Sequence, residues 1–262
     1  MHFTKLLALI SVFFAFSGCK NLKYKSTVSP LVWGGTVSHH DLASKYIDDF
    51  FCKIKDNREV KTFFIISPSH YGLSVYDYSI ADFSWKVDEN TVVFSDKEKT
   101  ESIAKELDVG YDTQVFYPEH GVYTLIPYIH RYFPDADVVA IAVNGEPPVN
   151  VDYAEKLYKV IEPYFDENGR KENFLLISTD FSHHADRKET YRKDKISEKF
   201  FKKRKLKDWF VCICDNRPGM YVLSRMADEK TNVVHFVHTD SYKISGQGKD
   251  DITSYFFSLL SE

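Results

Sequence analysis

The chain has 262 residues and a formal net charge of −4, with 34 basic and 38 acidic side chains. A nucleic-acid-binding domain normally carries a marked basic excess, so this balance argues against a nucleic-acid partner. Of the four cysteines, an odd number remains after Cys19, which does not fit the disulfide framework of a small secreted domain.

Residues 1–18 have the pattern of a signal peptide of the lipoprotein type. Lys5 precedes an almost continuous apolar run that ends in small residues before Cys19. This order is typical of a secretory signal, and the run is too short to span a bilayer. The ending "FSGC" resembles a bacterial lipobox, so we expect lipidation of Cys19, with a plain secretory peptide as the alternative. Residues 19–30 would be a polar tether, and acyl chains would anchor the protein in the bacterial cell envelope, on its periplasmic or surface side.

Residues 31–262 are long enough for one α/β domain with a substantial core. Near-continuous apolar runs such as "KTFFIISPSH" and "NFLLISTDFSHH" are typical of strands buried on both faces. Stretches with helical apolar spacing lie between them, as in "DLASKYIDDFFCKIK". The alternation predicts an α/β fold with a central, mainly parallel or mixed sheet flanked by helices.

Three segments carry more particular expectations. Residues 71–95 alternate polar and aromatic side chains and predict a hairpin or lid. Pro127 should kink or break the helix expected in "VYTLIPYIHRYF". The basic run "KFFKKRKLKD" reads as the solvated face of a helix, with the following side chains turned inward: Phe200, Phe201, Leu206 and Phe210.

Histidines and acids gather in five short motifs, at least two of them at predicted strand ends. They are "VSHHD" with His39 and His40, "SPSHYG" with His70, "PEHG" with Glu119 and His120, "STDFSHH" with Asp180 and His183, and "CICDNRPG" with Cys214 and Asp215. Sites in α/β folds lie beyond the carboxyl ends of the strands, and this mixture of ligands suits a transition metal. One histidine alone is more often a hydrogen-bonded structural residue. Five such motifs together favour a site.

The ordered set "GGTVSHHDLA", "ISPSHYG", "EHGVYTLIPYI", "ISTDFSHH" and "CICDNRPG" resembles the Memo-like family, which includes the bacterial AmmeMemoRadiSam system protein B. The resemblance extends from Trp33 to the C-terminal "SYFFSLL". It implies a fold similar to that of the class III extradiol (LigB-type) dioxygenases. That fold is α/β with a mainly parallel sheet, and in the dioxygenases it holds a non-haem iron.

The resemblance also implies roles for individual residues. The metal ligands would be His39, His70 and Cys214; the residues that handle protons would be His183, Asp180 and Glu119; and the pocket neighbours would be His40, His120 and Asp215. Asp180 would orient His183 by accepting a hydrogen bond. His184 would lie outside the site.

Departures from the family's motifs bear on the metal. Ser38 stands where the family has Pro, Asp215 where it has Gly, and Gly121 where it has Ser. A thiolate at the third position favours copper or zinc over iron, whereas Asp215 would restore an oxygen ligand. The resemblance therefore implies one transition-metal ion, either Cu, Fe or Zn.

Three functions remain open on the sequence alone. The first is a membrane-tethered, metal-dependent redox enzyme related to the extradiol dioxygenases. The second is a non-catalytic binding or scaffold protein with a vestigial pocket, and the resemblance implies a modification pathway shared with radical-SAM and AMMECR-type partners. In the third, which we rank last, the histidines make only structural hydrogen bonds.

Overall fold

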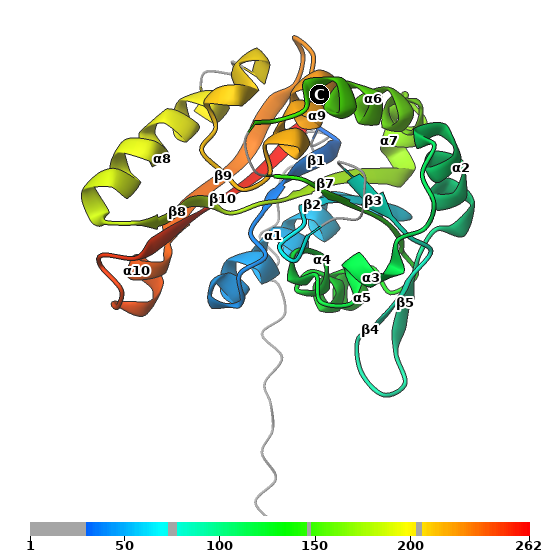
Figure 1. The fold of residues 1–262 in the computed structure, drawn as a ribbon, viewed down its shortest axis with the longest axis horizontal. Helices are drawn as coiled ribbons and strands as arrows, with labels where there is room; N and C mark the ends of the chain where they lie inside the picture. The colour runs from blue at the N-terminus through cyan, green and yellow to red at the C-terminus, as the bar shows by residue number, and fades with distance from the viewer. Residues whose placement is uncertain (1–29, 73–77, 146–147, 203–205) are drawn as a thin grey trace, which may run out of the picture.

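The computed structural model describes residues 30–72, 78–145, 148–202 and 206–262 (Figure 1). The predicted signal peptide, Cys19 and nearly all of the predicted tether lie outside these residues and stay predictions. Within the described ranges, no helix is both long enough and apolar enough to cross a membrane.

A mixed eight-stranded sheet forms the centre of the molecule, in the order β3-β6-β2-β7-β1-β10-β8, with β9 paired to β10. The strands are β1 (Val32–Val37), β2 (Thr62–Pro68), β3 (Tyr78–Ile80), β6 (Asp137–Val143), β7 (Asn173–Ser178), β8 (Phe181–Ala185), β9 (Asn232–Asp240) and β10 (Ile252–Ser261). The four neighbours β6, β2, β7 and β1 run parallel, and the other pairings are antiparallel. The predicted α/β fold with a central mixed sheet is confirmed.

The parallel strands are almost completely buried because helices cover both faces. Every residue of β1, β2 and β7 is buried, which agrees with their apolar runs. Gly35 in β1 allows β10 to approach closely, since a Cβ there would lie 2.0 Å from the carbonyl oxygen of Ser258. A side chain at this position would force β1 and β10 apart.

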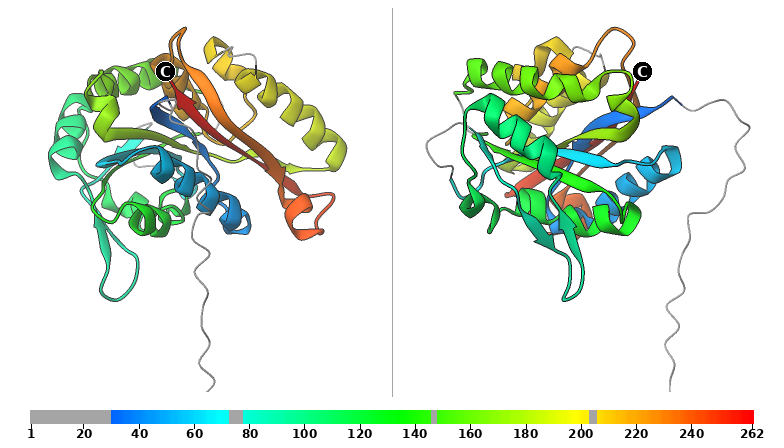
Figure 2. Two further views of the ribbon diagram at one scale, coloured as in Figure 1. Left: turned by 180° about the vertical axis from the view of Figure 1, so that it is seen from behind. Right: turned by 90° about the vertical axis from the view of Figure 1, so that its right-hand side faces the viewer.

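Helices lie on both sides of the sheet (Figures 1 and 2). One face packs against α1 (Ser44–Asn57) and α5 (Ile126–Tyr132), with the short α4 (His120–Tyr123) beside them. The other face packs against α2 (Lys97–Leu107), α6 (Val151–Ile161), α8 (Arg187–Lys202) and α9 (Arg217–Met226). The short helices are η1 (Asp41–Ala43), α3 (Thr113–Phe116), η2 (Glu162–Phe165), α7 (Gly169–Glu172), η3 (Leu206–Val211) and α10 (Ser241–Ser245).

The more particular expectations have mixed outcomes. Pro127 divides the expected helix as predicted, because α4 ends before it and Pro127 stands in the first turn of α5. Phe200 and Phe201 are buried, but Phe210 is 59% exposed, so the inward placement of Phe210 was wrong. Since α8 ends at Lys202 and Phe210 belongs to η3, the helical repeat does not carry through to it. The side chain of Leu206 lies outside the description.

The hairpin expected within residues 71–95 is formed by β4 (Ser84–Lys86) and β5 (Val92–Phe94). It projects from the body of the molecule in Figure 1. Trp85 is fully buried and anchors the hairpin on the core. Residues 73–77 of the expected segment lie outside the description.

Candidate metal site

The candidate site lies where neighbouring parallel strands end. His39 follows β1, His70 follows β2 and Asp180 follows β7, and these three strands are adjacent in the order β2-β7-β1. The carboxyl ends of parallel strands meet at one edge of a sheet, which brings the three side chains together. The start of α4 adds Glu119 and His120, and the segment before α9 adds Asp215.

Three imidazoles form a compact group at this edge. One ring nitrogen from each of His39, His70 and His120 lies within 4.8 Å of the others. The ring centroids of His70 and His120 are 4.0 Å apart, and those of His39 and His70 are 4.8 Å apart. His39 is buried, whereas the other two are partly open to solvent. Imidazoles at these separations can hold a metal ion.

The carboxylate of Asp215 lies among the imidazoles. Its Oδ2 is 3.4 Å from His39 Nε2, 3.3 Å from His183 Nε2 and 3.9 Å from His70 Nε2. Its Oδ1 is held by the Thr179 hydroxyl at 2.8 Å and by the Asp180 backbone N–H at 3.0 Å. Oδ2 is buried and accepts no hydrogen bond from any described residue. A buried anionic oxygen left in this way among ring nitrogens suits a bound cation.

The carboxylate of Glu119 fixes the orientation of His70. Its Oε1 lies 2.7 Å from His70 Nδ1, its Oε2 accepts from the His70 backbone N–H at 2.8 Å, and Oε1 also accepts from the Gly121 N–H at 2.7 Å. Nδ1 therefore donates, and in the neutral ring Nε2 keeps its lone pair. Gly121 permits this packing, because a Cβ there would lie 2.1 Å from the Ser67 hydroxyl oxygen.

The hydroxyl of Ser178 fixes the orientation of His39. The Ser178 hydroxyl donates to the carbonyl oxygen of Gly121 at 2.6 Å and lies 2.9 Å from His39 Nδ1. Because its only proton goes to Gly121, Ser178 must accept from His39 Nδ1. The neutral tautomer then leaves Nε2 of His39 free, on the side of Asp215. Both histidines present Nε2 to the same region.

The acids and histidines shift one another's protonation. Burial lowers the pKa of His70, but the negative charges of Asp215 and Glu119 close to the ring outweigh it and raise that pKa to about 9. Burial also acts to lower the pKa of His39, but the negative charges of Asp180 and Asp215 outweigh it, so that this pKa is raised. Burial and the charges of His70 and His39 lower the pKa of His120 to about 4, so His120 is neutral at pH 7.

Cys214 is not one of the three residues that form the compact imidazole group. It packs against the apolar cluster under α9, and the backbone beside it bridges to Phe181 in β8. Burial and the charge of Asp215 raise the pKa of its thiol to about 12. The sequence led us to expect Asp215 and His120 only as neighbours of the metal ligands. In the described residues, both lie against His39 and His70.

The remaining expected residues are divided between the site and the surface. Asp180 is buried with Oδ2 3.9 Å from His39 Nε2, and the carboxylate beside His183 is that of Asp215 rather than the expected Asp180. His40 is exposed and accepts a hydrogen bond from the Leu42 N–H at 3.2 Å, which caps η1. His184 is exposed and pairs with Asp251 at 2.7 Å.

Three supporting residues were not anticipated: Ser178, Thr179 and Asn216. The Asn216 side-chain amide donates to the carbonyl oxygens of Ile66 and Ser178, at 2.8 and 2.9 Å, and so ties the ends of β2 and β7 to α9. The available signal was position, since each is a small polar residue within a motif that already carried an acid or a histidine.

A mixed sheet with helices on both faces, and histidines and carboxylates at the ends of its parallel strands, defines an α/β protein with a candidate metal site. A family model described as "Memo-like protein" matches residues 37–249, and the chain belongs to this family. The resemblance noted in the sequence is thereby confirmed.

Curated relatives agree with this assignment. A MEMO1 family protein of Pyrobaculum aerophilum is 29% identical over 136 residues, which are 52% of this chain and 47% of that protein. One from Caldivirga maquilingensis is 26% identical over 135 residues, 51% of this chain and 46% of the relative. One from Sulfolobus acidocaldarius is 25% identical over 205 residues, 74% and 69% of the two chains. The chain thus spans about half the length of the first two relatives.

Proposed function

We propose that this Memo-like protein binds one transition-metal ion through His39, His70 and Asp215 and that it is a metal-dependent redox enzyme. The observation that carries the proposal is the buried Oδ2 of Asp215, which has no described hydrogen-bond donor and lies near Nε2 of both histidines. Two imidazoles and one carboxylate are the donor set of many non-haem iron oxygenases. The resemblance to the LigB-type dioxygenases supports the same class of chemistry.

The surroundings of these donors fit a metal. Glu119 and Ser178 each occupy Nδ1 of one histidine, so that Nε2 is the nitrogen available for coordination. His120 is neutral at pH 7 and adjacent, and it offers a further nitrogen. The nitrogen and oxygen donors favour iron, whereas coordination by Cys214 would favour copper or zinc and would require a thiol of raised pKa to ionise.

A metal held there would supply Lewis-acid and one-electron chemistry. The residues of the chain would manage protons around it. His183 Nε2 is buried without a described hydrogen-bond partner, and the charge of Asp215 outweighs its burial and raises its pKa. In this proposal His183 holds a proton that it can pass to a substrate atom. Glu119 acts through His70 by fixing its ring, and it does not touch the substrate.

Elemental analysis of the purified full-length protein tests the metal. We expect about one metal ion per chain, with loss of the ion in His39→Ala, His70→Ala and Asp215→Ala but not in Cys214→Ala. His184→Ala is the matched control, because His184 is an exposed histidine beside His183. Metal-free protein whose melting temperature is indifferent to chelator would contradict the proposal.

A second candidate is a binding or scaffold role with a vestigial pocket, in a pathway with radical-SAM and AMMECR-type partners. It is favoured by the ion pairs themselves, since Asp215 Oδ2 lies within ion-pair distance of His39, His70 and His183 and can be stabilised by a protonated imidazole without any metal ion. The candidates separate on metal content: a scaffold retains its fold and its partners when the three proposed ligands are replaced.

The proposed location is the bacterial envelope, through a lipid on Cys19, and it is supported by residues 1–18 alone. Growth with an alkyne-tagged fatty acid should label the native protein and place it in the membrane fraction. Cys19→Ser should abolish the label. An unlabelled native protein in the soluble fraction would rule the anchor out.

A further inference from the structure

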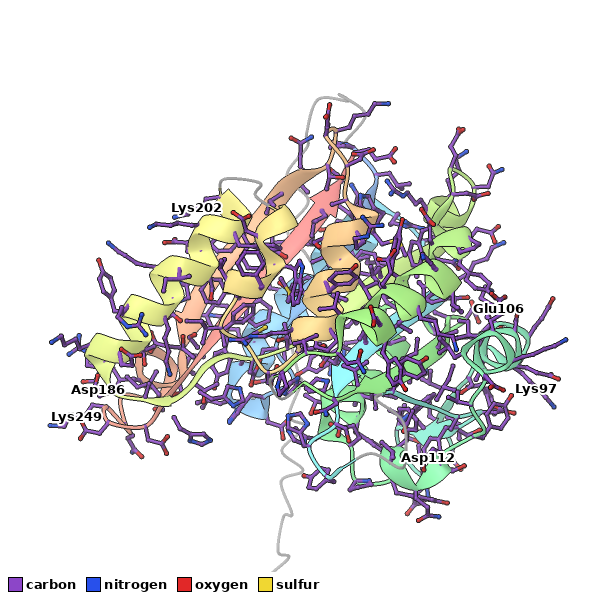
Figure 3. All side chains as sticks on the ribbon, turned by 45° about the horizontal axis from the view of Figure 1, so that its top comes forward. Lys97, Glu106, Asp112, Asp186, Lys202 and Lys249 are labelled. Atoms are coloured by element: carbon purple, nitrogen blue, oxygen red, sulfur yellow. The ribbon has the colours of Figure 1, made fainter. Side chains whose placement is uncertain are left out.

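A pocket separate from the candidate metal site lies between α8 and the segment from the end of β9 through α10 to β10. Its volume is about 710 Å³, and the lining residues that matter here are Arg187, Lys188, Tyr191, Asp194, His238 and Tyr242. Small-molecule sites commonly have volumes of about 300–1,000 Å³. In Figure 3 the start of α8, marked by Asp186, lies at the same edge of the molecule as Lys249, on the side opposite Lys97. None of these residues belongs to the candidate metal site.

The floor of this pocket is a fully paired carboxylate. Asp194 is 3% exposed, and its Oδ1 accepts from the hydroxyls of Ser182 at 2.5 Å and Ser254 at 2.6 Å. Its Oδ2 lies 2.8 Å from His238 Nε2. Because the carboxylate can only accept, His238 carries a proton on Nε2. Nδ1 of His238 makes no hydrogen bond to any described residue and remains available at the pocket wall.

The uncompensated charge of the pocket is positive. Asp194 has three donors, and Asp240 pairs with Lys243 Nζ at 2.8 Å and caps α10. Within the described part of the chain, neither Arg187 nor Lys188 has a carboxylate oxygen within the 4.0 Å of an ion pair. An anion entering the pocket would therefore meet two free cations, and Arg–phosphate contacts are among the stronger charge-assisted hydrogen bonds.

The pocket also offers aromatic surface next to these cations. The Arg187 guanidinium carbon lies 5.3 Å from the centre of the Tyr242 ring, and Tyr191 is 62% exposed. Tyrosine faces bind planar rings by offset stacking. Anion-binding side chains beside ring-binding side chains select a ligand that contains both parts.

We propose that this pocket binds a small organic phosphate with a planar ring, of the size of a mononucleotide. Arg187 and Lys188 hold the phosphate, Tyr242 and Tyr191 contact the ring, and His238 Nδ1 takes a hydrogen bond from a hydroxyl of the ligand. The site goes beyond the proposed metal function and does not depend on it. Its floor reaches β8 through Ser182, the residue before His183.

Isothermal titration calorimetry of the full-length protein tests the site with three probes: adenosine 5′-monophosphate, adenosine and inorganic phosphate. We expect the nucleotide to bind with a Kd below about 1 mM, and at least about tenfold more tightly than either fragment, because each fragment supplies only one of the two contacts. Arg187→Ala and Lys188→Ala should each weaken the nucleotide about tenfold, and Tyr242→Leu should weaken the nucleotide but not phosphate.

Lys97→Ala removes an exposed lysine on α2, remote from the pocket, and should leave the affinity unchanged. The melting temperature of each variant is recorded so that unfolding is not read as lost binding. Absence of saturable nucleotide binding would overturn the proposal. So would equal affinity in Arg187→Ala, Lys188→Ala and Lys97→Ala, or phosphate that binds as tightly as the nucleotide.

Discussion

Asp194 and Asp215 both contact histidines, and they differ in what their second oxygen does. Asp194 uses both oxygens, accepting from Ser182 and Ser254 on one and from His238 on the other. Asp215 uses Oδ1 in the same way but leaves Oδ2 without a described donor, among three imidazole nitrogens. A buried histidine–aspartate contact is therefore not by itself a sign of function. Asp215, whose Oδ2 has no described hydrogen-bond donor, is the candidate metal ligand. Asp194, whose oxygens both accept hydrogen bonds, has a structural role.

The largest effect should come from removing the satisfied carboxylate. Asp194→Ala leaves two hydroxyls and an imidazole N–H without their acceptor, in a region tied to β8, β9 and β10. We expect the free energy of unfolding to fall by about 3–5 kcal/mol, as for other broken buried charged networks. Urea denaturation measures the loss, and Asp251→Ala, at an exposed pair, is the control. Similar stability in both variants would show that the Asp194 contacts contribute little.

The next largest effect should come from Glu119→Gln, which we expect to lower metal affinity without affecting the fold. Glu119→Gln keeps the size of the side chain but weakens its contact with His70 Nδ1, so we expect metal affinity to fall about 10–100-fold. A competition assay with a chelating dye measures it. The melting temperature of the metal-free variant controls for folding. Unchanged affinity would mean that Glu119 does not orient a ligand.

The dependence of metal affinity on pH should be smaller and graded. Metal at His70 must displace the proton that the raised pKa, about 9, keeps on the ring in the metal-free protein. Lowering the pH therefore strengthens the competing proton, and affinity should fall by up to about tenfold for each pH unit below 9 from this group. Dissociation constants measured across neutral pH test the slope. A flat profile would exclude His70 as a ligand.

The smallest effect is expected at Asp180. Burial raises the pKa of its carboxyl, so its charged form is disfavoured in the folded protein, and Oδ1 is buried without a described partner. Asp180→Asn removes that charge and should leave the stability of the metal-free protein unchanged or slightly higher. Thermal melting in chelator compares it with Asp194→Ala. If Asp180→Asn lowered the melting temperature as much as Asp194→Ala does, Asp180 would instead be a residue that stabilises the fold.

The sequence predicted the parts of the site that depend on strand ends. The apolar runs of β2 and β7 are long enough to identify as buried strands, and His70 and Asp180 follow directly from where they stop. His39 required the family resemblance as well, because β1 contains two glycines and a weaker pattern. For a residue that directly follows a recognisable buried strand, its position along the chain is sufficient to predict that it lies at the site.

The choice between Cys214 and Asp215 could not be made in the same way. The segment that carries both residues is irregular: Cys214 forms an isolated bridge with Phe181, and Asp215 follows it in a bend. The bridge is a contact across 33 residues, so tertiary packing rather than a local repeat determines which side chain lies against the histidines. His120 is similar, because its place beside His70 depends on where α4 docks.

The backbone of Gly121 links the two proposed histidine ligands, His39 and His70, through hydrogen bonds. Its N–H binds the carboxylate that holds His70, and its carbonyl binds the hydroxyl that holds His39. The space in which its side chain would stand is filled by the Ser67 hydroxyl. Where the family motif has a serine at position 121, this chain therefore places a hydroxyl in the same volume from the neighbouring strand. Positions 67 and 121 can be expected to change together, each tolerating a larger residue only when the other becomes smaller.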